Sequence, residues 1–276
     1  MEIQAAKTLI QTALNEDIGS GDITTDNLID QNLTGRGVLI AKEPLVLAGI
    51  DIARQVFQSL DTTIEFEALF SDGDTADTGD TLAHIQGNLA ALLKGERTAL
   101  NFLQRLSGIA TNVADHVRLL EGTSVRLVDT RKTTPGWRVL EKYAVRVGGA
   151  HNHRMGLYDG VLIKDNHIAA FGSVAKSITH IRKHVSHLVK IEVEASTLAE
   201  VKEALQVGVD VIMLDNMSLE DVRAAVAVIQ QAALVEVSGN VTRIDLPKLA
   251  DTGVDIISIG ALTHGARAVD ISMRIT

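Results

Sequence analysis

The chain has 276 residues, 46% of them hydrophobic, with no cysteine and a formal net charge of −9. The absence of cysteine excludes disulfides, a thiolate nucleophile and cysteine-ligated metal clusters, and it agrees with a reducing cytoplasm. The negative charge argues against broad binding to nucleic acids or anionic membranes, which need a cationic surface. The stretch from Met1 to Lys7 lacks a basic segment followed by an apolar run, and no eighteen-residue apolar run occurs. We therefore expect a cytoplasmic protein with neither a signal peptide nor a membrane span.

The first hundred residues predict mixed helices and strands. Helical spacing runs from Ile3 to Leu14, and a helix is expected over residues 50–60. Short apolar runs predict strands, and the acid-rich stretch 72–80 reads as a polar hairpin connection. The expected strands span residues 38–41, 45–50, 64–69 and 82–85. A long helical stretch covers residues 89–120, where the pair Ser107-Gly108 favours a split into two helices.

Charge is unevenly distributed along the chain. Residues 131–164 contain seven Lys or Arg and two acids, a net charge of +5, so the remainder carries −14. A local cationic patch in an acidic protein indicates an anionic small ligand. The alternative is a solvated helix face, which fits Arg138, Lys142 and Arg146 through their i, i+4, i+8 spacing but not the other cations.

After residue 121 strands and helices alternate, which predicts a parallel sheet with right-handed crossovers. The apolar runs span residues 125–128, 160–163, 188–193, 209–214, 234–237 and 255–259. The last four strand ends, at residues 194, 215, 238 and 260, are 21, 23 and 22 residues apart, the length of one βα unit. Six strands are too few for the eight of a complete barrel, so we expect an incomplete TIM-like barrel, or one closed by other parts of the chain.

The ends of these strands carry the groups that a phosphosugar enzyme needs. Arginine and lysine bind carboxylates and phosphates, and acidic side chains accept hydrogen bonds from sugar hydroxyls or hold Mg²⁺. Small residues let main-chain N–H groups approach a phosphate. The cations are Arg131, Lys132, Arg154 and Lys164, the acids are Glu194 and Asp215, and the small-residue ends are Ser238-Gly-Asn240 and Gly260-Ala261.

Each of these residues also has a structural interpretation. A lysine or arginine at one strand end is functional in about one case in three, and only the agreement of six strand ends raises that figure. Glu192 and Glu194 point to the same side of one strand, so one of them is sufficient for function and the other is expected to pair with a lysine.

Histidines occur in two patterns that resemble metal sites. His151-Asn-His153 lacks a third ligand nearby, so hydrogen bonding to a ligand is the preferred interpretation. His180, His184 and His187 lie on one helix face without the glutamate of a zinc-protease motif, which favours a solvated face.

The sequence resembles the quinolinate phosphoribosyltransferase family over essentially its whole length. The most specific stretches are Asp129-Thr-Arg-Lys132 and His151-Asn-His-Arg154. Others are Asn15 to Thr25, Gly95 to Thr111, Leu162 to His167, Glu192-Val-Glu194, Met213 to Asn216, Glu236 to Asn240 and Gly260 to His264. The resemblance implies an N-terminal α/β-sandwich domain, residues 1–105, and an open α/β-barrel catalytic domain, residues 106–276, whose C-terminal tail can pack back on the first domain. It further implies a homodimer or larger symmetric assembly.

The resemblance also implies an activity. The family transfers phosphoribose from 5-phosphoribosyl 1-diphosphate to the nitrogen of quinolinate and releases CO₂, giving nicotinate mononucleotide and pyrophosphate for NAD synthesis. The resemblance further implies roles for individual residues. Quinolinate would contact Arg131, Lys132, His153 and Arg154, in a site that also includes Thr130. The donor would contact Lys132, Lys164, Glu194 and Asp215, and the two acids would also hold Mg²⁺. Its 5-phosphate would lie on Ser238, Gly239, Asn240, Gly260 and Ala261, and Arg97 would reach a neighbouring subunit's site.

Two other functions remain open from the sequence. A Schiff-base aldolase would use Lys164 as its nucleophile, although it would leave the arginines and the acidic strand ends without a role. A paralogue of the molybdate-operon type would bind a phosphorylated ligand on the same scaffold without this chemistry. Five residues present together argue against the paralogue: Arg97, Arg131, Lys132, Arg154 and Lys164.

Overall fold

A computed structural model describes residues 2–276, with the side chains of the first helix described from Ala6 onwards; Met1, where the amino-terminal prediction begins, lies outside the described residues. The chain forms two compact units. The first comprises the chain up to Ala114 with 133–149 and 261–276, and the second comprises 115–132 and 150–260. The domain boundary expected between residues 105 and 106 falls inside helix α4 (Leu89–Arg118) and stays a prediction.

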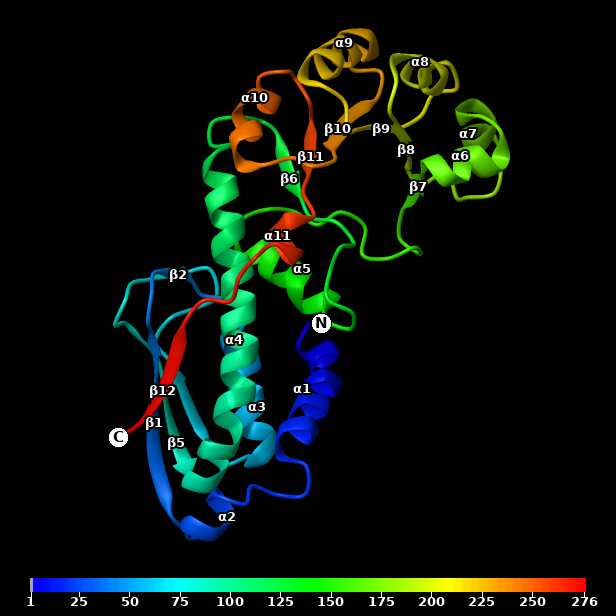
Figure 1. Cartoon of the computed structure of the whole chain (residues 1–276). Coiled ribbons are helices and arrows are strands. Elements are labelled where there is room, and N and C mark those ends of the chain that lie inside the picture. The colour runs from blue at the N-terminus through cyan, green and yellow to red at the C-terminus, as the bar shows by residue number, and fades with distance from the viewer. Residues whose placement is uncertain (1) are drawn as a thin grey trace. The chain divides into compact units, whose positions relative to one another are not determined.

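The first unit contains an antiparallel four-stranded sheet in the order β12-β1-β5-β3 (Figure 1). The strands are β12 (Ile271–Ile275), β1 (Thr34–Ala41), β5 (Thr81–Asn88) and β3 (Glu65–Ala68), and a small pair joins β2 (Leu45–Val46) to β4 (Thr75–Ala76). The helices of this unit are α1 (Glu2–Ile18), α2 (Thr25–Leu28), α3 (Ile50–Leu60), α4 as far as residue 114, α5 (Arg138–Val147) and α11 (Ala261–His264). The last strand of the chain therefore pairs with the first strand, from Gly37↔Ile275 to Ala41↔Ile271.

Helix α3 shows why the apolar pattern predicted its position correctly. Its core-facing residues include Ile52, Val56 and Phe57, which follow helical spacing and are buried. The ring of Phe57 contacts Phe66 of β3, with centroids 6.3 Å apart. A Cβ at Gly95 of α4 would lie 2.8 Å from Cδ1 of Phe57, so the glycine allows α4 to pack closely on α3.

Helix α4 is continuous, so the expected split at Ser107-Gly108 is wrong. The Ser107 hydroxyl is fully buried and accepts a hydrogen bond from the main-chain nitrogen of Ala48 at 3.0 Å. At Gly108 a Cβ would lie 2.0 Å from the carbonyl oxygen of Arg267. The pair therefore serves close packing against other segments rather than a break in the helix.

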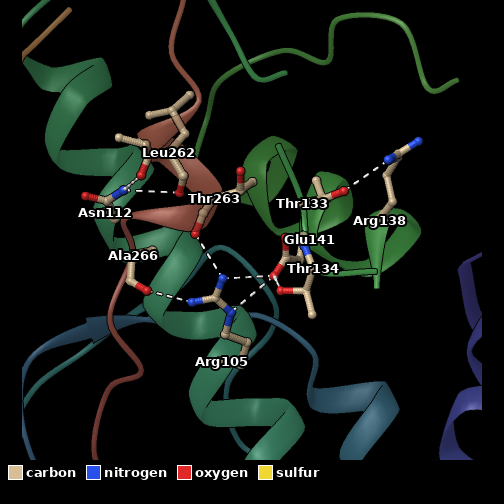
Figure 2. Close-up of polar contacts among 10 residues, drawn as sticks. Arg105, Asn112, Thr133, Thr134, Arg138, Glu141, Leu262, Thr263 and Ala266 are labelled. Carbon is tan, nitrogen blue, oxygen red and sulfur yellow. Dashed lines mark hydrogen bonds and ion pairs between the residues drawn. The ribbon is translucent and has the colours of Figure 1, made fainter. Parts of the chain in front are cut away.

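A buried charge network ties three segments of the first unit together (Figure 2). Arg105 of α4 forms an ion pair with the fully buried Glu141 of α5, with Nη2 2.9 Å from Oε1. The same guanidinium donates to the carbonyl oxygens of Thr263 and Ala266, and Thr134 donates to Glu141 through its main-chain nitrogen and its hydroxyl. Glu141 thus receives charge and hydrogen bonds on both oxygens, as a buried carboxylate requires.

The interpretation of Arg138, Lys142 and Arg146 as a solvated helix face is wrong for the middle residue. Arg146 is exposed and Arg138 is half-buried, but Lys142 is completely buried in α5. The four-residue spacing places these side chains on one side of the helix, but it carries no information about what packs against that side.

The second unit contains the predicted six-stranded parallel sheet, which does not close into a barrel. Its order is β6-β11-β10-β9-β8-β7, and helices α7, α8 and α9 lie along one side of it (Figure 1). The strands are β6 (Arg126–Val128), β7 (Val161–Ile163), β8 (Ile191–Ala195), β9 (Val211–Asp215), β10 (Leu234–Ser238) and β11 (Ile256–Ser258). The helices are α6 (Asp165–Phe171), α7 (Val174–Arg182), α8 (Leu198–Gln206), α9 (Leu219–Ile229), the 3₁₀ turn η1 (Arg243–Asp245) and α10 (Leu246–Ala250).

Local signals position several of these helices. Thr197 begins α8 with a capping box, in which its hydroxyl accepts from the main-chain nitrogen of Glu200 and the Glu200 carboxylate accepts from that of Thr197. His180, His184 and His187 are exposed as expected, but α7 ends at Arg182, so only His180 lies on a helix and the expected single helix face is wrong. Within the described part of the chain, the structure contains no helix with the length and apolar character needed to span a membrane.

Candidate active site

The loop after β6 is held by Asp129, which is completely buried at the end of that strand. Its two carboxylate oxygens accept hydrogen bonds from the main-chain nitrogen of His153 at 2.9 Å and from Nδ2 of Asn152 at 2.6 Å. A parallel bridge between Val128 and His151 extends the same contact. The strand end that carries Thr130, Arg131 and Lys132 is thereby attached to the segment that carries His153 and Arg154.

Two arginines, Arg131 and Arg154, are half-buried in this part of the second unit. Arg154 is half-buried and donates from Nη1 to the carbonyl oxygen of Gly160 at 2.9 Å. Burial is the main cause that lowers the pKa of Arg154, and the positive charge of Arg131 lowers it further. The carboxylates of Glu192, Asp159 and Glu194 oppose that shift. Like charges held together in a partly dry site favour an anionic ligand that neutralises both.

Lys164 follows β7 directly and forms an ion pair with Glu194 on the neighbouring strand β8. The lysine side chain remains 44% exposed whereas the glutamate side chain is 13% exposed, so the ammonium group is accessible from solvent. The main-chain nitrogen of Lys164 donates to Nδ1 of His167 at 3.0 Å, which fixes the start of α6. The structure thus brings two of the predicted site residues into direct contact.

Asp215 ends β9 and lies in register with Ser238, the last residue of β10. Glu194 pairs with Met213, two residues before Asp215, so Glu194 and Asp215 point to the same face of the sheet. Glu194 and Asp215 are both half-buried.

The turn after β10 requires its glycine. Gly239 has φ +93°, and a Cβ there would lie 2.3 Å from Oδ1 of Asn216. The same oxygen accepts from Nδ2 of Asn240 at 3.2 Å, and Asn216 donates from its main chain to the carbonyl of Ser238 at 3.1 Å. Asn216, which follows Asp215, therefore shapes the small-residue turn that the sequence indicated as a phosphate site.

The remaining predicted residues are distributed over both units. Thr130 accepts a hydrogen bond from the main-chain nitrogen of Lys132 at 3.0 Å, and Lys132 is exposed. Gly260 follows β11 in the second unit, whereas Ala261 begins α11 and belongs to the first. Arg97 is exposed on α4 in the first unit, so it is not among the groups that the second unit brings together.

Sequence reasoning missed a buried acidic pair. Glu192 is 7% exposed and Glu236 is 2% exposed, and both approach Nε2 of His153, at 3.0 Å and 3.6 Å. Glu194 was the predicted site residue, so the lysine partner was expected for the other member of the pair; instead Glu194 contacts Lys164 and Glu192 contacts His153, and that expectation is wrong. An acid at the centre of an apolar run, as in Leu234 to Val237, was the available signal, because a buried carboxylate needs a partner.

His153, Glu192 and Glu236 form the only group of three metal-type ligands within the described residues, with ligand atoms within 4.8 Å of one another. The acids predicted to hold Mg²⁺, Glu194 and Asp215, do not belong to this group. Burial, and after it the charge of Glu192, raises the pKa of Glu236 to about 8, against the opposing effect of His153.

An open parallel barrel whose strand ends collect cations, carboxylates and small-residue turns defines a class of enzymes that act on phosphorylated substrates. Family models agree on a particular member of that class. The model described as "Quinolinate phosphoribosyl transferase, C-terminal domain" matches residues 109–274, and the corresponding N-terminal domain matches residues 22–107. The chain belongs to the quinolinate phosphoribosyltransferase family, as the resemblance predicted.

Individual relatives cover nearly the whole chain. A protein named "Probable nicotinate-nucleotide pyrophosphorylase [carboxylating]" from Bacillus subtilis is 44% identical over 98% of this chain and 93% of its own length. Its namesake from Synechocystis is 46% identical over 96% of this chain and 91% of its own length. The crystal structure of NadC from Streptococcus pyogenes is 42% identical, with a TM-score of 0.96 over 100% of this chain and 98% of that one.

Proposed function

We propose that this chain converts quinolinate and 5-phosphoribosyl 1-diphosphate to nicotinate mononucleotide, pyrophosphate and CO₂. The observation that carries the proposal is that hydrogen bonds from Asp129 attach the strand end of Arg131 to the segment of Arg154, and that both arginines are half-buried. A dicarboxylate such as quinolinate neutralises both, and planar guanidinium groups match carboxylates through paired hydrogen bonds. Lys132, which follows Arg131, and His153, which precedes Arg154, complete this side of the proposed site.

The donor is proposed to bind beside this pair. Lys132 and Lys164 would meet its diphosphate, while Glu194 and Asp215 would accept hydrogen bonds from its ribose hydroxyls. The two acids lie on adjacent strands and face the same side, which suits Mg²⁺ that arrives with a diphosphate, because this ion is commonly bound by one or two carboxylates together with substrate phosphates. Mg²⁺ would neutralise charge on the departing pyrophosphate. The 5-phosphate would lie on main-chain groups of Ser238, Gly239, Asn240, Gly260 and Ala261.

The charges of this chain fit both halves of the reaction. The quinolinate nitrogen forms a bond to the anomeric carbon as the bond to pyrophosphate breaks, and the positive charge that develops on the ribose is stabilised by Glu194 and Asp215. The 2-carboxylate then leaves as CO₂, its bonding electron pair passes to the ring carbon beside the pyridinium nitrogen, and a proton replaces it. Partial burial beside Arg154 leaves the carboxylate less hydrated than in water, which favours its loss.

The direct test is incubation of the purified protein with quinolinate, the phosphoribosyl donor and Mg²⁺. We expect nicotinate mononucleotide and CO₂ in equal amounts, and neither product when any one component is omitted. Absence of product with a folded protein would overturn the proposal. A borohydride-trapped substrate adduct on Lys164 would instead favour the aldolase interpretation.

We further propose a cytoplasmic homodimer or larger symmetric assembly in which Arg97 serves the site of a neighbouring subunit. This role agrees with its exposure and with its place outside the unit that carries the strand-end groups. Mixing inactive Arg97→Ala and inactive Lys164→Ala subunits should restore activity, because hybrid assemblies contain some intact sites. No recovery after demonstrated subunit exchange would contradict the shared site.

A further inference from the structure

The buried group formed by His153, Glu192 and Glu236 brings together two strands that are not neighbours. Glu192 lies on β8 and Glu236 on β10, with β9 between them in the sheet. In a curved parallel barrel, alternate strands contribute side chains to the same interior layer, which explains how the two carboxylates reach one imidazole. His153 comes from the loop held by Asp129.

Both ring nitrogens of His153 are engaged within the protein. The main-chain nitrogen of Arg154 lies 2.7 Å from Nδ1 and donates to it, and because an amide N–H can only donate, Nδ1 carries no proton. The proton of the neutral ring is therefore on Nε2, which lies 3.0 Å from Oε2 of Glu192. A carboxylate at that position accepts this proton in a hydrogen bond and selects the tautomer.

We propose that Glu192 and Glu236 are positioning residues that hold His153 in its Nε2-protonated tautomer, and that His153 thereby sets the main chain of Arg154. The inference rests on the proposed function, because the placement of Arg154 matters only if the site binds an anionic substrate. It also changes the role of His153 from direct contact with quinolinate to support of the arginine beside it.

The alternative tautomer would disturb the arginine directly. A proton on Nδ1 would face the N–H of Arg154 across 2.7 Å, donor against donor, and the arginine main chain would have to move. A buried donor left without a partner is costly, which favours displacement of the loop. Glu192 lies nearer to Nε2 than Glu236 does, at 3.0 Å against 3.6 Å, so Glu192 is the carboxylate that selects the tautomer.

Nuclear magnetic resonance tests the tautomer without reference to activity. Protein labelled with ¹⁵N-histidine contains nine histidines, and loss of one signal set in His153→Gln assigns the residue of interest. At neutral pH and with EDTA present, we expect an unprotonated Nδ1 and a protonated Nε2. An imidazolium, the opposite tautomer, or replacement of the Nε2 proton when Zn²⁺ is added would overturn the proposal, the last because the group would then be a metal site.

Kinetics test the consequence for the substrate. Glu192→Ala removes the acceptor, so KM for quinolinate should rise roughly tenfold while KM for the phosphoribosyl donor stays near its original value. Glu192→Gln keeps a carbonyl oxygen for Nε2 and should restore both the tautomer and the quinolinate KM. The matched control is Glu220→Ala, an exposed glutamate at the start of α9.

Each kinetic outcome decides between positioning and simple packing. Equal loss in Glu192→Ala and Glu192→Gln with an unchanged tautomer would overturn the positioning role. So would a uniform fall in kcat without a change in quinolinate KM. If neither substrate reacts even with the unsubstituted protein, the proposed function fails, whereas the NMR result still reports on the tautomer.

Discussion

Two glutamates, Glu141 and Glu236, are buried almost to the same extent but have opposite surroundings. Glu141 is fully buried in the first unit, where Arg105 and Thr134 donate to its two oxygens (Figure 2). Glu236 is 2% exposed in the second unit, and its ionisable neighbours are the carboxyl group of Glu192 and the imidazole of His153. The first arrangement satisfies a charge and stabilises a fold; the second makes charge unfavourable and lies beside the proposed site, where perturbed groups tend to collect.

The largest expected effect on stability comes from breaking the ion pair between Arg105 and Glu141. Arg105→Ala leaves the Glu141 carboxylate buried without its cation, which should lower the free energy of unfolding by about 3–5 kcal/mol. Chemical denaturation of the variant measures this loss. The double variant Arg105→Met/Glu141→Leu is the informative control, because it removes both charges and should recover much of the stability; equal loss in both would contradict a charge-based explanation.

The arginines of the site should affect catalysis more than stability. Arg154→Ala or Arg131→Ala removes a charge-assisted contact worth about 1.5–3 kcal/mol, so kcat/KM for quinolinate should fall at least roughly tenfold. Steady-state kinetics with each substrate varied in turn measure the effect. Removing one of two mutually repelling cations should leave the melting temperature unchanged or raise it. Near-original kinetics in both variants would remove the basis for the proposed dicarboxylate site.

The buried carboxyl group of Glu236 should make the stability of the fold depend on pH. Burial, then the charge of Glu192, raises the pKa of Glu236 from 4.5 to about 8, while His153 and Ser258 oppose the shift. Below pH 4.5 Glu236 is protonated in both the folded and the unfolded state, and between pH 4.5 and about 8 it is protonated only in the folded state. The stabilising contribution of protonated Glu236 is therefore lost as pH rises to about 8, by about 1.4 kcal/mol per pH unit.

Glu236→Gln tests this dependence, because a carboxamide does not titrate. The variant should gain stability relative to the original protein as pH rises from 5 toward 8, as urea denaturation at several pH values would show. Glu220→Gln, on an exposed glutamate, is the matched control and should give a constant difference. A constant difference for Glu236→Gln as well would show that the carboxyl group is already ionised.

The smallest expected effect lies away from both glutamates. Thr197→Ala removes the capping hydroxyl of α8 and should cost about 1 kcal/mol without changing quinolinate kinetics. Thr197→Ser keeps the hydroxyl and should preserve stability. A catalytic effect of Thr197→Ala would indicate that general loosening of the second unit, rather than loss of specific charges, explains the site variants.

Much of this organisation was predictable from local patterns. Apolar periodicity located α3, and strand ends spaced by one βα unit indicated which polar residues share a face. Contacts between distant segments were not predictable, since they depend on what packs against a side chain. The spacing of Lys142 did not reveal its burial, and Ser107-Gly108 read as a helix break although it allows close packing.

The buried acidic pair illustrates the same limit for the site. Glu192 and Glu236 lie 44 residues apart in sequence, and only the curvature of the sheet brings them to one imidazole. Their position inside apolar runs indicated burial but not the partner. The role of Asn216 also depends on three-dimensional context, because its side-chain oxygen accepts a hydrogen bond from Asn240, 24 residues later in the chain, in the turn after β10.

The pairing of β12 with β1 has a consequence for synthesis on the ribosome. Strand β1 emerges early, but residues 271–275 that pair with it are made after every strand of the parallel sheet. The first unit therefore cannot complete its antiparallel sheet during most of translation, and its β1 edge is free to pair with other chains until β12 arrives. The order of synthesis thus makes the end of translation the step at which the earliest part of the protein finishes folding.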